Sequence, residues 1–404
     1  MRLAVLICIL ASWAVPAATS EPRTARNGSI VYVHQAPRNP NPLSIWVIVD
    51  ESGFGIRRLF FGPKNMTSPH WSADGRRLVF QRDSGVYVAT FETMRLSIPT
   101  DVPQRRIARF SIVNSVDWSP DGTSLVLAMN PHRLERRFCT ELYTMRTDRS
   151  RLRRLTMTAA CEANPAWSPD GLQIAFEAEG DERTEIVVVN LLGANRRVIG
   201  EGTFPAWSPD GRSLAFLTRD SIVVADAATG SVHRTLEPDV NYDELENGLT
   251  WSPDGMRLVH GFNDLTETKP VTHLAGIDVD GTDSFQLTPQ DTFPDMEPDW
   301  QPVCTLYGTD GDDVLVGTPG DDLICGLRGE DVIRAGLGDD TILGGDGNDS
   351  IHGGGGSDLL FGAAGNDRVY ALDGLPDVAN GGPGRDRFWG DQVDTVSEVE
   401  TRFG

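Results

Sequence analysis

The feature that most restricts the fold of this chain is a pentapeptide built on tryptophan. Five segments read Trp-Ser-Pro-Asp-Gly, or Trp-Ser-Ala-Asp-Gly in the first case, and an alternating apolar segment follows each one. A sixth, degenerate copy reads DWQP. The six tryptophans are Trp71, Trp118, Trp167, Trp207, Trp251 and Trp300, spaced 47, 49, 40, 44 and 49 residues apart. This spacing is typical of a four-stranded propeller blade.

The composition of each copy predicts its local structure. Ser-Pro-Asp-Gly is a turn sequence, in which Pro presets φ and Gly closes the turn. Further apolar segments follow each turn, and with the strand that carries Trp they give four strands per blade. Near residues 29–61 only three such strands are found, with no Trp-Ser-Pro-Asp-Gly copy before them. We predict that residues 297–301 add the fourth, which would close a ring of six blades and leave no exposed sheet edge.

These copies resemble the repeat of TolB-type propellers, which is also found in the non-catalytic propellers of prolyl-oligopeptidase-like enzymes. The resemblance covers residues 27–302 and implies a six-bladed β-propeller. It does not determine the function, because propellers serve in binding, scaffolding and catalysis alike.

No catalytic residue and no organic cofactor site is predicted in the propeller. A turn role explains the repeated aspartates Asp74, Asp121, Asp170, Asp210 and Asp254, and no GxSxG nucleophile motif is present. The seven histidines do not cluster at metal-ligand spacing. His70, beside a blade tryptophan, is interpreted as a packed or solvated side chain at the central channel. Asn114, Asn164, Asn247 and Glu297 are expected to approach the same channel.

The last quarter of the chain contains a second, shorter repeat. From Gly308 to Tyr370 the sequence divides into seven units of nine residues: GTDGDDVLV, GTPGDDLIC, GLRGEDVIR, AGLGDDTIL, GGDGNDSIH, GGGGSDLLF and GAAGNDRVY. Every unit has Gly at position four, Asp at position six and an aliphatic residue at position eight. A disordered acidic linker is the alternative that composition alone suggests, but the strict period of nine argues against it.

The units resemble the RTX (hemolysin-type) calcium-binding nonapeptide. The resemblance implies a parallel β-roll with two units per turn, and with Ca²⁺ between bends that stack 18 residues apart. The predicted calcium-binding residues are Gly308, Gly311, Asp313, Gly317, Gly320, Asp322, Gly326, Gly329, Asp331, Gly338, Asp340, Gly344, Gly347, Asp349, Gly353, Gly356, Asp358, Gly365 and Asp367.

Physical chemistry explains these residue types. Ca²⁺ takes six to eight hard oxygen ligands, and glycine bends can turn tightly and direct several carbonyls inward. Residues 304–404 contain 20 Asp and Glu and 6 Arg, a net charge of -14 out of -22 for the whole chain. Seven units offer five pairs one turn apart, so up to five ions would add +10 and leave about -4. We therefore expect calcium binding and folding of this segment to be one event.

After Tyr370 the repeat is predicted to lose its register. The segment ALDGLPDVAN has ten residues, with Pro376 where Asp is expected. GGPGRDRFW restores the motif once and makes Asp386 a possible further ligand. The remaining residues, to Gly404, are expected to cap the roll.

The N-terminus predicts export. Residues 1–20 combine Arg2, an apolar run from Leu3 to Val15 and small residues at a cleavage site, as in a Sec-type signal peptide. A membrane anchor is the alternative, although the run is short for a bilayer span. Four cysteines remain in an exported chain, and two disulfides are expected. Proximity favours Cys139 with Cys161 and Cys304 with Cys325, while three pairings are possible and a zinc site is the competing interpretation.

The sequence thus predicts an all-β protein in three segments: a signal peptide at 1–20, a propeller at 27–302 and a calcium-binding β-roll with its cap at 304–404. The expected function is secreted or cell-surface calcium binding, with a protein or a surface polymer as partner of the propeller. The acidic net charge argues against nucleic acid as partner, and no membrane span is expected. The alternatives are an extracellular hydrolase or lyase with its site at the channel mouth, and a Tol-like envelope partner.

Overall fold

The structure is a computed structural model. It describes residues 29–35, 43–48, 56–60, 65–83, 85–91, 103–110, 112–130, 139–158, 160–180, 183–238, 242–264, 271–288, 294–302, 304–309 and 311–403. The predicted signal peptide lies outside these residues. Within them, no helix is long and apolar enough to cross a bilayer.

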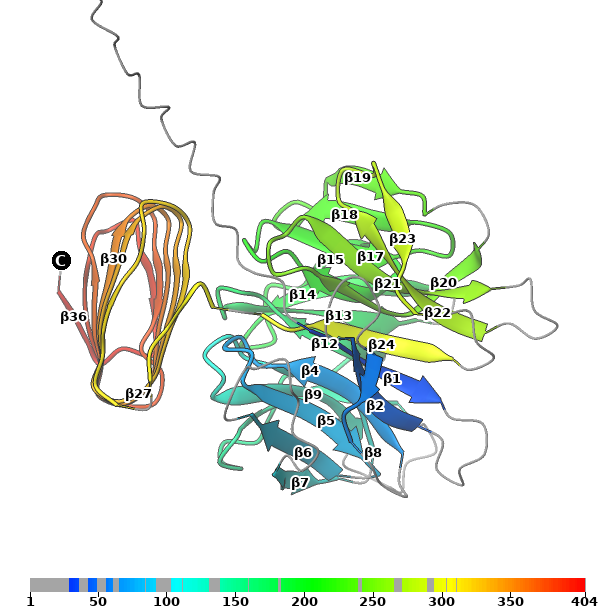
Figure 1. Cartoon of the computed structure of the whole chain (residues 1–404), viewed down its shortest axis with the longest axis horizontal. Helices are drawn as coiled ribbons and strands as arrows, with labels where there is room; N and C mark the ends of the chain where they lie inside the picture. Colours follow the sequence, from blue (N-terminus) through cyan, green and yellow to red (C-terminus); the bar gives the residue numbers. More distant parts are fainter. Residues whose placement is uncertain are drawn as a thin grey trace, which may run out of the picture.

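The first part of the chain forms a six-bladed propeller of four-stranded antiparallel sheets (Figure 1). Blade 1 contains β24 (Asp295–Trp300), β1 (Ile30–Gln35), β2 (Leu43–Ile48) and β3 (Ile56–Arg58). Blade 2 contains β4 (Met66–Trp71), β5 (Arg77–Arg82), β6 (Gly85–Thr90) and β7 (Gln104–Arg109). Blade 3 contains β8 (Ile112–Trp118), β9 (Ser124–Asn130), β10 (Glu141–Arg146) and β11 (Arg153–Arg154). Blade 4 contains β12 (Cys161–Trp167), β13 (Gln173–Glu179), β14 (Thr184–Asn190) and β15 (Arg197–Glu201). Blade 5 contains β16 (Thr203–Trp207), β17 (Ser213–Leu217), β18 (Ile222–Asp226) and β19 (Val232–Leu236). Blade 6 contains β20 (Tyr242–Trp251), β21 (Arg257–Asp264), β22 (Val271–Asp278) and β23 (Ser284–Gln286).

Blade 1 is built from both ends of the propeller segment, as the sequence predicted. Strand β24 pairs antiparallel with β1, with Trp300 opposite Ile30. Beyond the strand, the Gln301 N–H donates to the Ser29 carbonyl, and the Gln301 side chain donates to the Gly75 carbonyl of blade 2. These hydrogen bonds join the first and last strands of the propeller segment and so close the ring of blades.

The repeated pentapeptide forms a tight turn after each tryptophan. In blade 2 the Ser72 hydroxyl donates to Asp74 Oδ1 over 2.5 Å, and the Arg76 N–H donates to the same oxygen over 2.9 Å. The following Gly75 has φ of 64°, which a glycine adopts without strain. The serine and aspartate of the other four copies pair in the same way. These aspartates are therefore turn residues.

The second part forms a parallel β-roll of two six-stranded sheets. The propeller-facing sheet contains β25 (Leu306–Tyr307), β27 (Leu323–Arg328), β29 (Thr341–Asp346), β31 (Leu359–Ala364), β33 (Val378–Asn380) and β35 (Thr395–Ser397). The outer sheet contains β26 (Val314–Val316), β28 (Val332–Leu337), β30 (Ser350–Gly355), β32 (Arg368–Ala371), β34 (Arg387–Gly390) and β36 (Thr401–Phe403).

The stacking of the roll has the predicted period of two nonapeptides. Ile324 lies opposite Ile342, and Ile342 opposite Leu360, each 18 residues further along the chain. The position-eight aliphatics point inward and form one core; they are Leu315, Ile324, Ile333, Ile342, Ile351, Leu360 and Val369, and none is more than 7% exposed.

The predicted break in the nine-residue register after Tyr370 is confirmed, but the sheet itself continues past it. Leu360 lies opposite Ala379, so the sheet continues with a step of 19 residues instead of 18. The extra residue is absorbed in the bend before β33. Because of that one-residue step, Asp377 takes the place that the sequence pattern gave to Pro376.

The roll packs against the end of the propeller where the pentapeptide turns lie (Figure 1). Ala73 of blade 2 contacts an apolar cluster that includes Leu343 and Phe361 of the propeller-facing sheet. Arg212 and Asp339 form an ion pair of 3.3 Å across the boundary, and Arg146 and Glu398 form another of 3.5 Å.

Candidate calcium-binding centre

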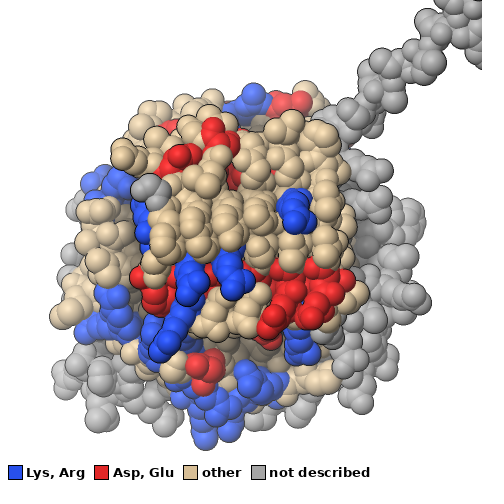
Figure 2. Space-filling view, turned by 90° about the vertical axis from the view of Figure 1, so that its left-hand side faces the viewer, with Lys and Arg blue, Asp and Glu red and all other residues tan. Residues whose placement is uncertain are grey.

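The position-six aspartates of the roll form two ladders through the backbone. The N–H of Asp331 donates to Oδ1 of Asp349, one turn later, over 2.9 Å. The same bond joins Asp322 to Asp340 and Asp340 to Asp358, over 2.8 and 2.9 Å. Each bond fixes the Oδ1 atom of one carboxylate. It thereby also fixes the direction in which the Oδ2 atom points. In the view of Figure 2, from the roll side, acidic side chains gather in a band across the molecule.

The second oxygen of these carboxylates is buried without a partner. Within the described residues, no hydrogen-bond donor reaches Oδ2 of Asp331, Asp340, Asp349, Asp358, Asp367 or Asp386. A buried charged oxygen without a donor or a cation is strongly unfavourable. The ladder therefore presents a series of oxygens whose charge a bound cation would compensate.

The first two aspartates of the series are different. Asp313 Oδ2 accepts from the N–H of Thr309 over 2.6 Å and from its hydroxyl over 2.8 Å. Asp322 Oδ2 accepts the same two bonds from Thr318. In the later units the position-two residue has positive φ, as in Gly345 at 113°, and this N–H does not reach the carboxylate. The threonines therefore replace a cation at the start of the roll.

Glycine occupies the position where most of these carboxylates approach the backbone, although Ala335 holds it before Asp340. A Cβ atom built on Gly326 would lie 2.5 Å from Asp331 Oδ2 and 2.4 Å from the Gly344 carbonyl oxygen. A Cβ atom on Gly347 would lie 1.8 Å from the Gly329 carbonyl oxygen. At these glycines, carbonyl and carboxylate oxygens of consecutive turns occupy the space that a Cβ atom would need.

Burial changes the proton affinity of these carboxylates. Desolvation raises the pKa of Asp340 to about 8, of Asp349 to about 7 and of Asp358 to about 6. Neighbouring carboxylates raise the pKa further, while a backbone N–H donor lowers it. The raised pKa means that the charged form is unfavourable unless a cation compensates it.

The donor set fits Ca²⁺. In the part of the chain that the structure describes, no three His, Cys, Asp or Glu side chains converge as a metal site. An ion here would therefore take one carboxylate oxygen from each ladder position and complete its shell with glycine carbonyls. Hard oxygens of these two kinds suit Ca²⁺, and the absence of nitrogen and sulfur ligands disfavours zinc.

A cavity of about 870 Å³ lies between the channel mouth of the propeller and the roll. All six blade tryptophans line it, together with Leu343, Phe361 and other residues of the propeller-facing sheet. His70, Asp117 and Asp299, each preceding a blade tryptophan, converge there. His70 Nδ1 lies 4.0 Å from Asp117 Oδ1 and 3.9 Å from Asp299 Oδ1.

The three groups are held in a poorly solvated place. Desolvation raises the pKa of Asp117 to about 7 and of Asp299 to about 8, and lowers the pKa of His70 to about 4. Backbone N–H groups of Trp167 and Trp71 donate to the two carboxylates and limit the rise in pKa. Three blades thus carry titratable groups at this position, whereas Ala166, Ala206 and Thr250 occupy it in the others.

Comparison with protein families agrees with this architecture. The model of the TolB beta propeller domain matches residues 19–304. The chain belongs to the TolB beta-propeller family. The model of the RTX calcium-binding nonapeptide repeat, which spans four copies, matches residues 307–342 and 334–369.

Individual relatives of this TolB-family chain are distant. It is 27% identical to the Tol-Pal system protein TolB of Alcanivorax borkumensis over 107 residues, which are 25% of this chain and 23% of that protein. The matched segment is thus less than a quarter of the relative. TolB from Acinetobacter baumannii has a similar structure, with a TM-score of 0.56, 18% identity and coverage of 68% of this chain and 67% of that one. Kuenenia stuttgartiensis hydrazine synthase superposes with a TM-score of 0.52, 11% identity and coverage of 69% and 47%. At these identities the structural likeness concerns the fold alone.

The structure also places the residues that the sequence singled out. The predicted aspartates and position-four glycines lie in the bends of the roll, whereas Gly326, Gly344 and Gly353 lie in strands β27, β29 and β30. The first two aspartates are paired with threonine. Asp377, which the sequence analysis missed, accepts from the Asp358 N–H over 2.8 Å, and Asp386 accepts from the Asp367 N–H over 2.8 Å. Glu297 and Asn164 line the cavity, while Asn114 is exposed and its neighbour Ser115 lines the cavity instead. The side chain of Asn247 lies outside the described residues.

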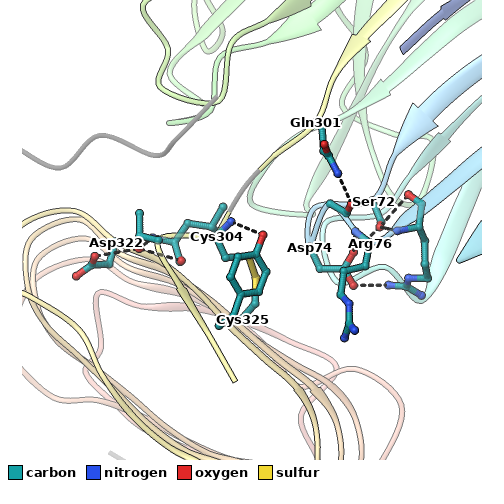
Figure 3. The surroundings of a disulfide bond; sticks show 12 residues. Ser72, Asp74, Arg76, Gln301, Cys304, Asp322 and Cys325 are labelled. Atoms are coloured by element: carbon teal, nitrogen blue, oxygen red, sulfur yellow. Dashed lines mark hydrogen bonds and ion pairs between the residues drawn. A yellow bond between two sulfur atoms is a disulfide. The ribbon is translucent and has the colours of Figure 1, made fainter. Parts of the chain in front are cut away.

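The cysteines form two disulfides, Cys139–Cys161 and Cys304–Cys325. Figure 3 shows the second one beside the turn of Ser72 and Asp74, where the chain leaves the propeller. The Cys304 N–H donates to the Tyr307 hydroxyl over 2.8 Å, which holds the first turn of the roll in place.

Proposed function

We propose that this chain is an exported calcium-binding protein whose roll folds on calcium and whose propeller is a recognition platform for a protein or a surface polymer. The observation that carries the proposal is the series of six buried Oδ2 atoms without a donor, at Asp331, Asp340, Asp349, Asp358, Asp367 and Asp386. Protein groups satisfy the equivalent oxygens at the two ends of the roll, in Asp313 and Asp322 at its start and in Asp394 at its end.

The coupling of binding and folding has a simple physical basis. The metal-free roll must bury carboxylates beside one another, which disfavours their charged form. Bound Ca²⁺ supplies positive charge and accepts oxygen lone pairs at these positions. The chain's own glycines leave the space, and the backbone N–H ladder orients the carboxylates before an ion arrives. Unfolded bends have no such arrangement, so binding stabilises the folded state.

The proposed place of action is outside the cytoplasm. A leader at residues 1–20, two disulfides and a roll that needs abundant calcium are mutually consistent with a secreted or surface protein. The proposed domains are the propeller at 27–302 and the roll with its cap at 304–404.

A calcium titration of the full chain tests the proposal. We expect amide hydrogen exchange of residues 304–404 to slow sharply and cooperatively when Ca²⁺ is added to chelator-treated protein. The variant Asp340→Asn/Asp349→Asn/Asp358→Asn should lose this response, because it keeps the Oδ1 acceptors and removes the charge. Asp346→Asn is the matched control, since that side chain is 71% exposed. Equal protection of the roll in chelator and in calcium would contradict the proposal.

A second candidate function follows from the channel mouth. His70, Asp117 and Asp299 converge in a cavity and have shifted pKa values, which is the pattern of many active sites. An extracellular hydrolase or lyase would use the two protonated carboxyls as acids. Turnover on a panel of glycan and ester substrates that Asp299→Asn abolishes would support this function; no turnover by the wild-type protein would argue against it.

A further inference from the structure

The outer rim of the propeller carries a group of arginines that the proposed calcium function does not use. Arg105 and Arg106 lie on β7, the outer strand of blade 2, and Arg149, Arg151 and Arg153 lie at and before β11, the outer strand of blade 3. We call these five residues the arginine arc. All five are exposed. In Figure 2 basic side chains gather along the lower edge of the molecule, on the side where β7 lies in Figure 1.

Contacts between the two blades make the arc continuous. Arg149 Nη2 donates to the Arg106 carbonyl over 2.9 Å, and Arg105 Nη2 donates to the Thr147 carbonyl over 3.4 Å. Arg153 Nη2 donates to the Leu192 carbonyl of blade 4 over 3.5 Å. Each guanidinium has five N–H groups, so these single bonds position the arginines and leave further donors directed to solvent.

Two arginines of the arc have a strained backbone conformation at a turn where blades 4 and 6 have glycine or asparagine. Arg149 has φ of 78° and Arg151 has φ of 53°. In blade 4 the same turn has Gly193 at 74° and Asn195 at 56°, and Gly193 N–H bonds to Asn190 O as Arg149 N–H bonds to Arg146 O. Gly281 holds the position in blade 6, with φ of 77°. Glycine and asparagine adopt this conformation readily and arginine does not. Such strain is retained most often at functional sites.

The fold compensates the charges of the arc only in part, through the attraction between Asp148 and Arg151. Neighbouring rim arginines pair with carboxylates: Arg154 with Glu141, Arg183 with Glu201 and Arg196 with Glu185. Considering the described residues alone, none of the five arc arginines forms such an ion pair. The Asp148 carboxylate in the same turn accepts from the Ser150 N–H over 2.7 Å. A concentrated positive charge on a chain of net charge -22 opposes the overall balance of the protein.

We propose that the arginine arc binds a linear acidic polysaccharide. Guanidinium groups recognise carboxylate and sulfate groups by paired hydrogen bonds, and five of them across two blade edges suit a repeating anionic chain better than one small anion. Duplex DNA carries one charge per about 1.7 Å, and a chain of net charge -22 opposes so dense an anion more than a sparsely charged polysaccharide. Single-stranded nucleic acids are bound largely by stacking on aromatic side chains. Among the described residues, the one exposed large aromatic hydrophobic side chain is Phe403, in the roll. The inference gives the ligand class of the propeller platform and so rests on that part of the proposed function.

Binding of the full chain to hyaluronate, which has carboxylates, and to dextran sulfate, which has sulfates, tests the inference, with neutral dextran as blank. The informative variant is Arg149→Gly/Arg151→Asn, because blade 4 has glycine and asparagine, Gly193 and Asn195, at the equivalent positions. We expect it to keep or raise the thermal midpoint and to weaken binding roughly tenfold at low salt. The control Arg183→Gln/Arg196→Gln removes the same net charge from blade 4 and should bind as the wild type does.

Each other result would overturn the inference. Unchanged binding by Arg149→Gly/Arg151→Asn, or an equal loss in the control, would mean that the arc is not the site. Binding to phosphatidylglycerol vesicles or to duplex DNA, but to neither polysaccharide, would assign another partner. Binding should persist in chelator, because the arc lies in the propeller. Calcium-dependent exchange in residues 304–404, measured on the same samples, reports separately whether the calcium part of the proposed function holds.

Discussion

Single aspartates in this chain show how surroundings determine the role of a residue. Asp74 accepts from a serine hydroxyl and a backbone N–H in a solvated turn, and its position is explained by the turn alone. Asp349 accepts one N–H through Oδ1, while its Oδ2 is buried without a donor. The same residue type is therefore a turn residue in the propeller and a candidate ligand in the roll.

The roll aspartates should make the metal-free protein sensitive to pH. Their pKa in the folded state, about 8 for Asp340 and about 7 for Asp349, lies above the ordinary value near 4. The folded roll thus binds more protons than the unfolded chain, so its stability is highest below about pH 4 and falls as pH rises towards about 8. In chelator, the urea concentration at which residues 304–404 lose exchange protection should decrease from pH 5 to pH 8. Calcium affinity should increase over the same interval, and the opposite trend in either quantity would contradict the assignment.

Not every residue-level feature was accessible from sequence. The period of nine placed the position-six aspartates correctly, because a strict repeat in a solenoid becomes a strict stack. The role of Thr309 and Thr318 was not predicted, since it depends on a position-two backbone conformation that later units do not share. A threonine at position two in the first two units alone is the signal that was present.

At the level of elements, the bends of the roll depend on glycines that have no space for a side chain. Gly354 has φ of 111°, and a Cβ atom there would lie 2.1 Å from the Gly336 carbonyl oxygen. Gly354→Ala should therefore destabilise the calcium-loaded roll by roughly 3 kcal/mol or more, from strain and overlap together. Denaturant unfolding of the full chain in calcium, followed by exchange of residues 304–404, measures the change.

Gly374→Ala is the matched control for that substitution. Gly374 also has positive φ, at 86°, but no atom lies within 4 Å of the point where a Cβ atom would stand. The substitution Gly374→Ala should lower the free energy of unfolding by only about 1 kcal/mol, because it adds backbone strain without an overlap. If both variants lost the same stability, the close approach of the Gly336 carbonyl oxygen would not be the reason for glycine at residue 354.

The disulfide at the start of the roll should stabilise its first turn. Cys304 and Cys325 are 21 residues apart in sequence, and closing a loop of this size restricts the unfolded chain by about 3 kcal/mol. Cys304→Ser/Cys325→Ser should lower the stability of the roll by that order and raise the calcium concentration needed for folding. Cys139→Ser/Cys161→Ser, within the propeller, should leave the calcium response unchanged. If both variants changed the calcium response of the roll equally, the location of the Cys304–Cys325 disulfide at the start of the roll would not explain the effect.

Element order could be predicted because the two repeats are explicit, but local irregularities could not. The innermost strands contain bulges three residues before tryptophan, where Ser68, Asn164 and Glu297 have positive φ. These bulges direct different side chains to the channel in each blade, and no shared residue type marks them. The sequence showed the inserted residue before β33 but not that the sheet continues past it, since a bend can absorb one residue without changing the sheet.

For the whole molecule, the decisive feature is the contact between the two domains. The roll covers the channel mouth, and residues of both line the 870 Å³ cavity. Neither repeat could predict this contact, because it joins side chains from separate periodicities, such as Ala73 with Leu343 and Phe361. The contact also connects the two proposed functions, since the cover consists of the segment whose folding should require calcium.

Calcium removal should therefore open the channel mouth. The Arg212–Asp339 ion pair across the boundary is exposed, with Arg212 70% and Asp339 51% accessible, so it contributes little. The apolar contact through Phe361 requires an ordered propeller-facing sheet. In chelator, amide exchange of the pentapeptide turns at residues 119–122 and 168–171 should become faster, while the central strands β9 and β13 stay protected. The variant Asp340→Asn/Asp349→Asn/Asp358→Asn should show the open pattern even in calcium. If the amides of these turns exchanged at the same rate in chelator and in calcium, the roll would not cover the channel mouth in solution.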